Sequence, residues 1–152
     1  MAVAEVPLFV IDATVILRWH FPTDASGRKA LDVLADFRAG RINLIGPPDF
    51  PEDVHDAISQ RVLLEQVDLE AARRASGTFD GLGIPTVSRV GMVSEAFKAA
   101  VRWDLYLNDG MYVALALLES CPLLTSDGRL IRALHATPVN VLRLEDYRSP
   151  QA

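Results

Sequence analysis

Two aspartates, Asp12 and Asp127, each follow a short apolar run of the kind that forms a buried strand. Leu8–Ile11 precedes the first aspartate, and residues 123–126 precede the second. In an open parallel sheet, ligands bind outside the carboxyl ends of the strands, so acids delivered there by different strands can converge. We therefore expect Asp12 and Asp127 to lie in one site.

Two more acids, Asp53 and Asp109, stand near the starts of predicted helices between Asp12 and Asp127. Together the four would form a carboxylate cluster, the oxygen-rich environment that Mg²⁺ and Mn²⁺ prefer. A metal ion held there would lower the pKa of a bound water and neutralise charge on a phosphoryl group. The pattern therefore indicates a metal site suited to phosphodiester hydrolysis.

Each of these acids also has a purely structural interpretation. Asp is a preferred helix N-cap residue, which would explain Asp12 and Asp127. Asp109 lies in the first turn of a predicted helix, where the macrodipole favours a carboxylate, and Asp53 fits a solvated helix face. For Asp12 and Asp127, the sequence leaves the cap and the metal ligand open as alternatives.

The elements expected to position the acids alternate between strands and helices. Strands are predicted at residues 8–11, 42–45, 123–125 and 139–142, with a short extended piece at 86–90. Helices are predicted at residues 25–39, 50–65, 69–75, 92–101, 109–119 and 128–134. This order predicts an α/β fold with a mostly parallel central sheet of four to five strands flanked by helices, an α/β/α sandwich.

Capping signals mark several of the predicted helix starts. Asp49 precedes the helix at 50–65 and has Glu52 three residues later, which is the spacing of a capping box. Asn108 is expected to cap the helix at 109–119.

Length and composition predict a single domain over residues 1–152 with its core at about 8–147, because half of the residues are hydrophobic. The longest apolar stretch, 113–118, is far shorter than the roughly 20 residues that span a bilayer, so no contact with a membrane is expected. Residues 1–6 lack the basic start of a secretion signal. We expect a cytoplasmic protein.

The net charge of −5 argues against a protein that coats nucleic acid by bulk electrostatics, although it does not exclude a nuclease. Of the 15 basic residues all but Lys29 and Lys98 are arginines, which suit phosphate contacts, and they are scattered along the chain. A basic patch can therefore assemble only through folding. Arg28 and Lys29 are interpreted as a solvated helix face.

Four local sequences resemble the motifs of PIN-domain nucleases. Residues 10–15 (Val-Ile-Asp-Ala-Thr-Val) resemble the opening strand and turn of that family, and residues 53–58 resemble its Glu-Val-x-Asn-Ala-Leu element. Residues 108–116 resemble its Tyr-Asp-Ala-x-Tyr-x-Ala-Leu-Ala helix, and residues 123–127 its Leu-Leu-Thr-x-Asp strand end. The order and spacing match over most of the chain and are most similar to VapC-type toxins of bacterial toxin–antitoxin pairs.

The resemblance implies a PIN-like domain that acts as a divalent-metal-dependent endoribonuclease. The acidic site would consist of Asp12, Asp53, Asp109 and Asp127, with Asp12, Asp109 and Asp127 as ligands of Mg²⁺ or Mn²⁺ and with Thr14 and Thr125 as hydroxyl supports. The resemblance also implies an RNA substrate, a cognate antitoxin partner and a homodimer.

The sequence departs from the family pattern at two acidic positions. Asp53 stands where the family usually has Glu, one methylene longer, and Asp56 stands where it has Asn. Glu52 is an alternative acid, ranked second because its capping-box spacing gives it a competing local role. These departures keep open an alternative function, a catalytically weak or inactive PIN-like interaction module. A phosphotransfer domain is disfavoured, because Thr14 stands where an aspartyl phosphatase needs an acid.

Overall fold

The computed structural model of the chain describes residues 5–21 and 25–150. Its sheet contains β1 (Leu8–Ile11), β2 (Asn43–Ile45), β3 (Leu123–Thr125) and β4 (Val141–Arg143). The strand order is β2-β1-β3-β4, and each neighbouring pair is parallel. The predicted α/β fold with a parallel central sheet is confirmed.

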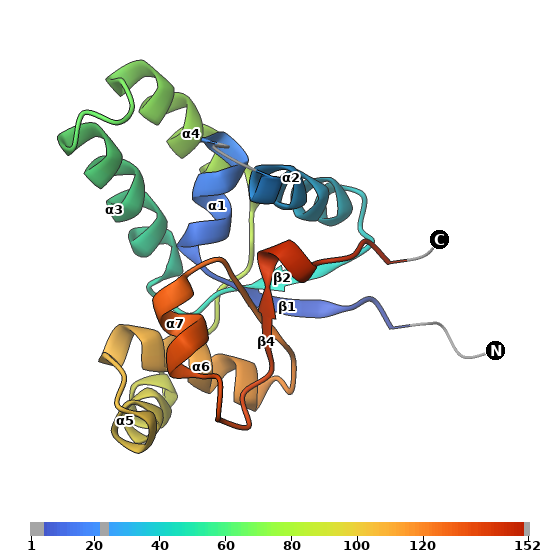
Figure 1. Cartoon of the computed structure of the whole chain (residues 1–152), viewed down its shortest axis with the longest axis vertical. Coiled ribbons are helices and arrows are strands. Elements are labelled where there is room, and N and C mark those ends of the chain that lie inside the picture. Colours follow the sequence, from blue (N-terminus) through green and yellow to red (C-terminus); the bar gives the residue numbers. More distant parts are fainter. Residues whose placement is uncertain (1–4, 22–24, 151–152) are drawn as a thin grey trace.

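Helices cover both faces of this sheet (Figure 1). They are α1 (Ala13–His20), α2 (Ala25–Arg38), α3 (Phe50–Leu63), α4 (Leu69–Leu82), α5 (Met92–Trp103), α6 (Leu107–Leu118) and α7 (Gly128–Ala133), followed by the 3₁₀ helix η1 (Leu144–Asp146). In Figure 1, α1 and α2 lie on one side of the sheet and α5 and α6 on the other. No helix in the described part of the chain has the length and apolar character needed to cross a bilayer.

The acidic site occupies the point where the sheet topology reverses direction. From β1 the chain continues to β2 on one side, whereas β3 pairs with β1 on the other side, so the carboxyl ends of β1 and β3 border a crevice. Ile11 is in register with Leu124, so the residues that follow them, Asp12 and Thr125, lie side by side at this end of the two strands.

Helix α1 was not predicted from the sequence. It follows Asp12 directly, and its Val15, Ile16 and Trp19 side chains are buried. Its residues include β-branched types with weak helix propensity, so tertiary burial stabilises the helix where local preference does not.

Several predicted boundaries were also wrong. Helix α4 continues to Leu82, beyond the predicted end at residue 75, and it includes Gly77 and Gly81, which had been assigned to a loop. Each glycine costs about 1 kcal/mol in a helix, a cost that the buried Phe79 side chain between them offsets. Strand β4 covers residues 141–143 instead of 139–142, and the extended piece at 86–90 contributes only a bridge between Thr86 and Gly46.

Candidate active site

Asp12 links the end of β1 to the start of α1. Its Oδ1 accepts hydrogen bonds from the Thr14 backbone N–H at 3.0 Å and from the Thr14 hydroxyl at 2.5 Å, and its Oδ2 accepts one from the Thr125 hydroxyl. The residue is 6% exposed. Burial raises the pKa of Asp12 to about 6, the threonine hydrogen bonds partly offset that rise, and the negative charge of Asp127 adds to it. Asp12 is therefore both a helix cap and a buried acid.

The two threonines connect the exits of β1 and β3. The Thr14 hydroxyl accepts a hydrogen bond from the Ser126 backbone N–H at 3.0 Å, and the Thr125 hydroxyl accepts one from the Asp127 backbone N–H at 3.0 Å. Because each hydroxyl oxygen accepts a hydrogen bond from a backbone N–H, its own proton is donated to the Asp12 carboxylate. Both predicted hydroxyl supports thus contact the Asp12 carboxylate.

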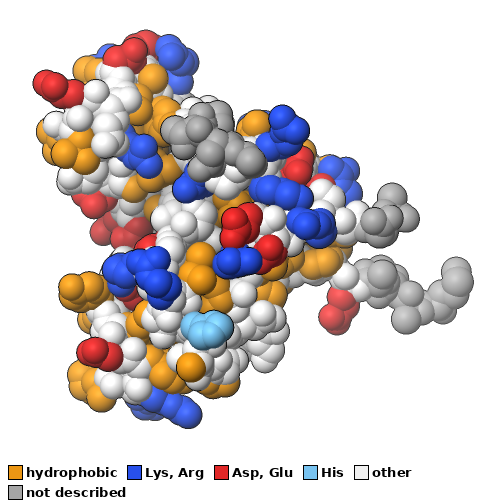
Figure 2. Space-filling model, in the orientation of Figure 1, with side chains coloured by type: hydrophobic (Ala, Val, Ile, Leu, Met, Phe, Trp, Pro, Cys, Tyr) orange, Lys and Arg blue, Asp and Glu red, His pale blue; other side chains and the backbone are white. Residues whose placement is uncertain are grey.

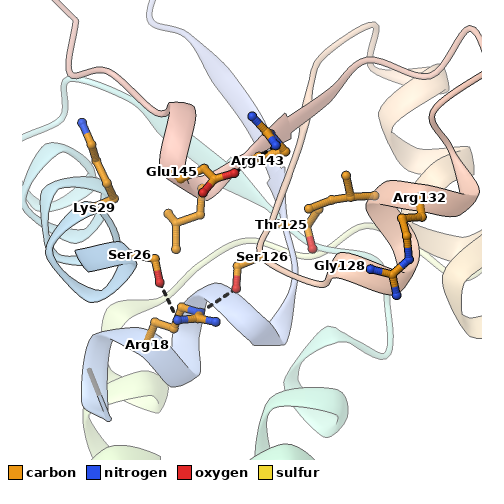
Figure 3. Close-up of a pocket in the computed structure, with 11 residues that line it drawn as sticks. Arg18, Ser26, Lys29, Thr125, Ser126, Gly128, Arg132, Arg143 and Glu145 are labelled. Carbon is orange, nitrogen blue, oxygen red and sulfur yellow. Dashed lines mark hydrogen bonds and ion pairs between the residues drawn. The ribbon is translucent and has the colours of Figure 1, made fainter. Parts of the chain in front are cut away.

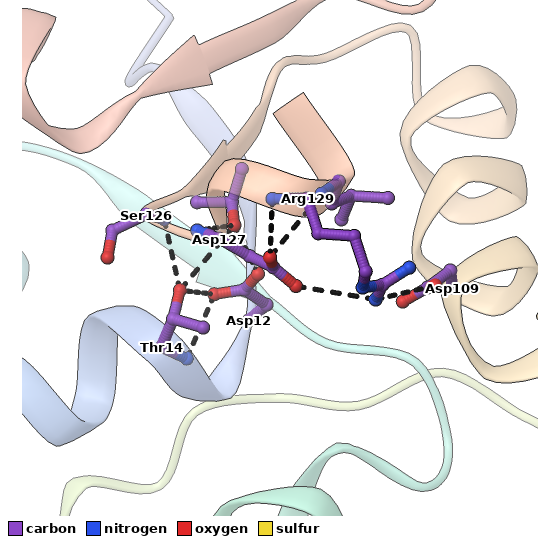
Figure 4. A network of polar contacts seen from close by, with 8 residues as sticks. Asp12, Thr14, Asp109, Ser126, Asp127 and Arg129 are labelled. Atoms are coloured by element: carbon purple, nitrogen blue, oxygen red, sulfur yellow. Dashed lines mark hydrogen bonds and ion pairs between the residues drawn. The ribbon is translucent and has the colours of Figure 1, made fainter. Parts of the chain in front are cut away.

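Asp127 and Asp109 face each other across the guanidinium of Arg129 (Figure 4). Asp127 caps α7, accepting hydrogen bonds from the backbone N–H groups of Arg129 at 3.0 Å and Leu130 at 3.4 Å. The Arg129 Nη2 atom lies 2.9 Å from Asp109 Oδ2 and 3.4 Å from Asp127 Oδ2. Asp109 Oδ2 is buried and has no well-directed hydrogen bond, so its contact with Arg129 is an ion pair without hydrogen-bond geometry.

Asp53 reaches the same region from α3. Its Oδ2 accepts a hydrogen bond of 2.7 Å from the Tyr112 hydroxyl on α6. Partial burial raises the pKa of Asp53, hydrogen bonds from Tyr112 and Asn108 counteract the rise, and the charges of Asp49 and Asp56 add to it. Asn108 was predicted to cap α6, but that helix begins at Leu107, and Asn108 lies within its first turn beside Asp53.

The capping box predicted for α3 does not form. Asp49 does precede the helix, but its side chain caps no backbone group and instead forms an ion pair with Arg89. Glu52 is exposed and does not line the acidic pocket. The acid that α3 directs into the pocket is Asp53, with Asp56 one turn later.

All four predicted acids line one small pocket of about 240 Å³. Its polar lining consists of Asp12, Thr14, Asp53, Asp56, Asn108, Asp109, Tyr112, Asp127 and Arg129. Thr125 lies behind Asp12 and lines a neighbouring cavity instead. Carboxylates that stand far apart in the sequence are thus brought together at the crevice between β1 and β3.

The carboxylates are not arranged as a preformed metal site. Within residues 5–21 and 25–150, no group of three or more His, Cys, Asp or Glu side chains is arranged closely enough to hold a metal ion. Asp12 is held by two threonines, Asp53 by a tyrosine, and the other two acids share Arg129. The side chains nevertheless suit a hard divalent cation, because the acids of the pocket offer only carboxylate oxygens. A cationic group, the Arg129 guanidinium, already lies between Asp109 and Asp127.

Sequence reasoning missed Arg129. It follows Asp127 by two residues, and the pattern of acids gave it no role. Its guanidinium contacts Asp109 on α6 and Asp127 at the start of α7. The position of the guanidinium therefore depends on the two helices being neighbours, which the sequence does not show.

No protein-family model matches the sequence, and no curated protein sequence matches it. Solved structures do share its fold. PAE2754 from Pyrobaculum aerophilum superposes with a TM-score of 0.65 at 18% identity, covering 94% of this chain and 93% of the other. VapC20 from Mycobacterium tuberculosis, described as a toxin that cleaves the sarcin–ricin loop, has a TM-score of 0.60 at 14% identity, with coverage of 82% and 94%.

A toxin–antitoxin complex from Klebsiella pneumoniae contains a further similar chain, with a TM-score of 0.57 at 16% identity and coverage of 90% and 97%. These similarities cover 82–94% of this chain and 93–97% of the other chains. The chain therefore has a VapC-like PIN fold, as its motifs predicted.

Proposed function

We propose that this protein is a divalent-metal-dependent endoribonuclease and the toxin of a toxin–antitoxin pair. The observation that carries the proposal is the convergence of Asp12, Asp53, Asp109 and Asp127 in one pocket at the topological switch point of the sheet. The fold it shares with VapC20, a toxin described as cleaving the sarcin–ricin loop, supports RNA as the substrate.

In this proposal, Asp12, Asp109 and Asp127 hold Mg²⁺ or Mn²⁺. A divalent cation bound by them supplies a water of lowered pKa and neutralises charge on the scissile phosphate. Thr14 and Thr125 fix the Asp12 carboxylate through three hydrogen bonds, so that it does not rotate away from the pocket.

Asp53 has the role of an outer acid in the same proposal. The buried Tyr112 hydroxyl keeps its proton, because burial and the nearby Asp53 raise the pKa of Tyr112, and it orients Asp53 by donating to it. An ion held by Asp109 and Asp127 would compete with the Arg129 guanidinium for the same oxygens, so Arg129 would have to move away from both carboxylates.

The proposal is tested by an RNA cleavage assay with Mg²⁺, Mn²⁺ or EDTA. We expect cleavage only with divalent metal, and a loss of at least about 100-fold in Asp12→Asn and Asp109→Asn, since even outer-sphere partners of metal ligands typically contribute 10- to 100-fold. Glu52→Gln is the matched control, because it removes an exposed carboxylate next to Asp53 and should cut normally. Cutting by both aspartate variants at the wild-type rate would refute the assignment.

A cytoplasmic homodimer with a cognate antitoxin completes the proposal. The similar chain in the Klebsiella pneumoniae toxin–antitoxin complex supports the antitoxin partner. Helix α5 carries a stripe of exposed apolar side chains, which is suited to a contact between two copies. The stripe consists of Val93, Phe97 and Val101, with exposed fractions of 39%, 62% and 69%. Sedimentation of the purified chain should give the mass of a dimer, and Phe97→Glu should give a monomer.

The alternative of an inactive interaction module has one specific observation in its favour. The carboxylates are engaged by Thr14, Thr125, Tyr112 and Arg129 and form no preformed cage in the described part of the chain. A metal titration combined with an RNA cleavage assay separates the two functions, because an inactive module would not cut RNA at any concentration of Mg²⁺ or Mn²⁺.

A further inference from the structure

A second cavity, of about 650 Å³, adjoins the acidic pocket along the connection from β3 to α7. It lies among α1, α2, α7 and η1, and Figure 3 shows the side chains that these elements contribute. Basic residues dominate it: its lining includes Arg18, Lys29, Arg132 and Arg143, and Glu145 is the one acid among the described lining residues.

This concentration of positive charge contrasts with the net charge of −5 for the whole chain. Figure 2 shows basic side chains gathered on one face of the molecule, over α7 and around α2 and η1. Folding thus assembles the basic patch that the scattered arginines do not form in the sequence.

Arg18 connects the basic cavity to the acidic site. Its Nε donates a hydrogen bond of 2.6 Å to the Ser126 hydroxyl, and its Nη1 donates to the Ser26 hydroxyl. Ser126 stands between Thr125, whose hydroxyl contacts Asp12, and Asp127. The guanidinium is therefore bonded to the residue that directly precedes Asp127, one of the predicted metal ligands, and that directly follows Thr125, which contacts Asp12.

Arg132 and Lys29 keep donors available to a ligand. The Arg132 guanidinium has no hydrogen bond or ion pair with any residue that the structure describes. Its Nη1 lies beside Gly128, where an added Cβ would be only 3.2 Å away. Lys29 Nζ donates to the Tyr147 carbonyl at 2.9 Å, and an ammonium carries three donors. Arg28 is exposed, as expected for a solvated face, whereas Lys29 is half-buried and lines the cavity.

Arg143 differs from the other cations of the cavity. Its Nη1 lies 3.0 Å from Glu145 Oε1, and its Nε lies 2.9 Å from Asp146 Oδ2. These two carboxylates neutralise its charge, so the cations that the cavity offers to a ligand are Lys29 on α2 and Arg132 on α7.

We propose that this cavity binds a backbone phosphate of the RNA, beside the phosphate that enters the acidic pocket. The inference rests on the proposed function, and it solves an electrostatic problem of that function: a pocket of carboxylates repels a polyanion, so cations next to it must hold the strand. Arginine forks and a lysine ammonium are suited to phosphate oxygens. A free anion such as inorganic phosphate shares this chemistry, and the experiment distinguishes the two sources.

The test measures binding of a short fluorescein-labelled single-stranded RNA in EDTA, where metal-dependent cleavage cannot interfere. Arg132→Ala removes an exposed cation of the cavity, and Arg74→Ala, on the remote helix α4, removes an exposed cation as a control for net charge. We expect Arg132→Ala to weaken binding about three- to tenfold and to reduce the slope of log K against log salt by about 0.7, the value for one phosphate contact on a single strand.

Arg132→Lys should retain most of the affinity, and Arg74→Ala should bind like the wild type. Equal affinity and salt slope in Arg132→Ala and Arg74→Ala would overturn the inference. So would inorganic phosphate binding that Arg132→Ala abolishes while RNA binding is unchanged, because the site would then hold a free anion.

The inference and the proposed function can fail separately. If the wild type does not cut RNA but Arg132→Ala still weakens binding, the nuclease proposal falls and the phosphate site stands. If the wild type cuts and Arg132→Ala changes neither RNA affinity nor KM, the phosphate site falls alone.

Discussion

The ionised Asp12 carboxylate should lower the free energy of unfolding of the metal-free protein at neutral pH, because it is buried. Its folded-state pKa of about 6 lies above the ordinary value of 3.8, so the folded protein binds the proton more tightly than the unfolded chain does. The free energy of unfolding therefore falls as the pH rises from about 3.8 to about 6, and it stays reduced above that range. The difference is worth about 3 kcal/mol, at about 1.4 kcal/mol for each tenfold change in proton affinity.

The substitution Asp12→Asn tests this cost directly, because an amide resembles the protonated acid and carries no charge. In EDTA at pH 7.5, we expect the variant to exceed the wild type by up to about 3 kcal/mol in unfolding free energy, or about 6–12 °C in Tm for a chain of this size. At pH 4, where the wild-type carboxyl is protonated, the two proteins should be nearly equally stable.

The assay is chemical and thermal denaturation of both proteins across pH 4–7.5, with Glu52→Gln as an exposed-acid control. Saturating Mn²⁺ should stabilise the wild type more than Asp12→Asn, because the ion compensates the buried charge. If Asp12→Asn is less stable than the wild type at pH 7.5, or if the difference between them does not vary with pH, the reasoning about burial at this site is wrong.

Three further predictions address the contacts around the site and the core. Arg129→Ala should raise Mn²⁺ affinity about two- to fivefold in calorimetry, since a half-exposed ion pair contributes up to about 1 kcal/mol; unchanged affinity would mean that the guanidinium does not compete with the ion. Gly110→Ala should lower the unfolding free energy by about 1–3 kcal/mol in urea denaturation, because its Cβ would lie 2.5 Å from the Ala96 carbonyl oxygen on α5; a more stable variant would contradict this packing. Tyr147→Phe should cost about 1.5–3 kcal/mol in the same assay, because it removes the 2.6 Å hydrogen bond to the buried Asp36 carboxylate; an unchanged midpoint would show that this bond contributes nothing.

The sequence predicted the sheet and the edge at which the acids meet. The apolar runs before Asp12 and Asp127 are strands β1 and β3, and two parallel strands necessarily end at the same edge. The cap interpretation of these aspartates is confirmed, because each caps a helix, and each also lines the acidic pocket, where the metal-ligand interpretation stays a prediction. A cap at a strand exit already points into the crevice, so the two roles do not exclude each other.

Features that depend on contacts between distant elements were not predictable. Asp49 pairs with Arg89 instead of capping α3, and Asn108 turns to Asp53 instead of capping α6. In both cases a tertiary partner replaces the local one that the sequence spacing suggested. Gly110 shows the same limit, since its small size is required by the approach of α5, which no local pattern reveals.

Anomalous diffraction from crystals soaked in Mn²⁺ tests the central claim most directly. We expect a manganese peak in the acidic pocket within coordination distance of Asp12, Asp109 and Asp127, with the Arg129 guanidinium displaced from both carboxylates that it now contacts. A peak elsewhere, or an empty pocket at saturating Mn²⁺ with Arg129 unmoved, would contradict it.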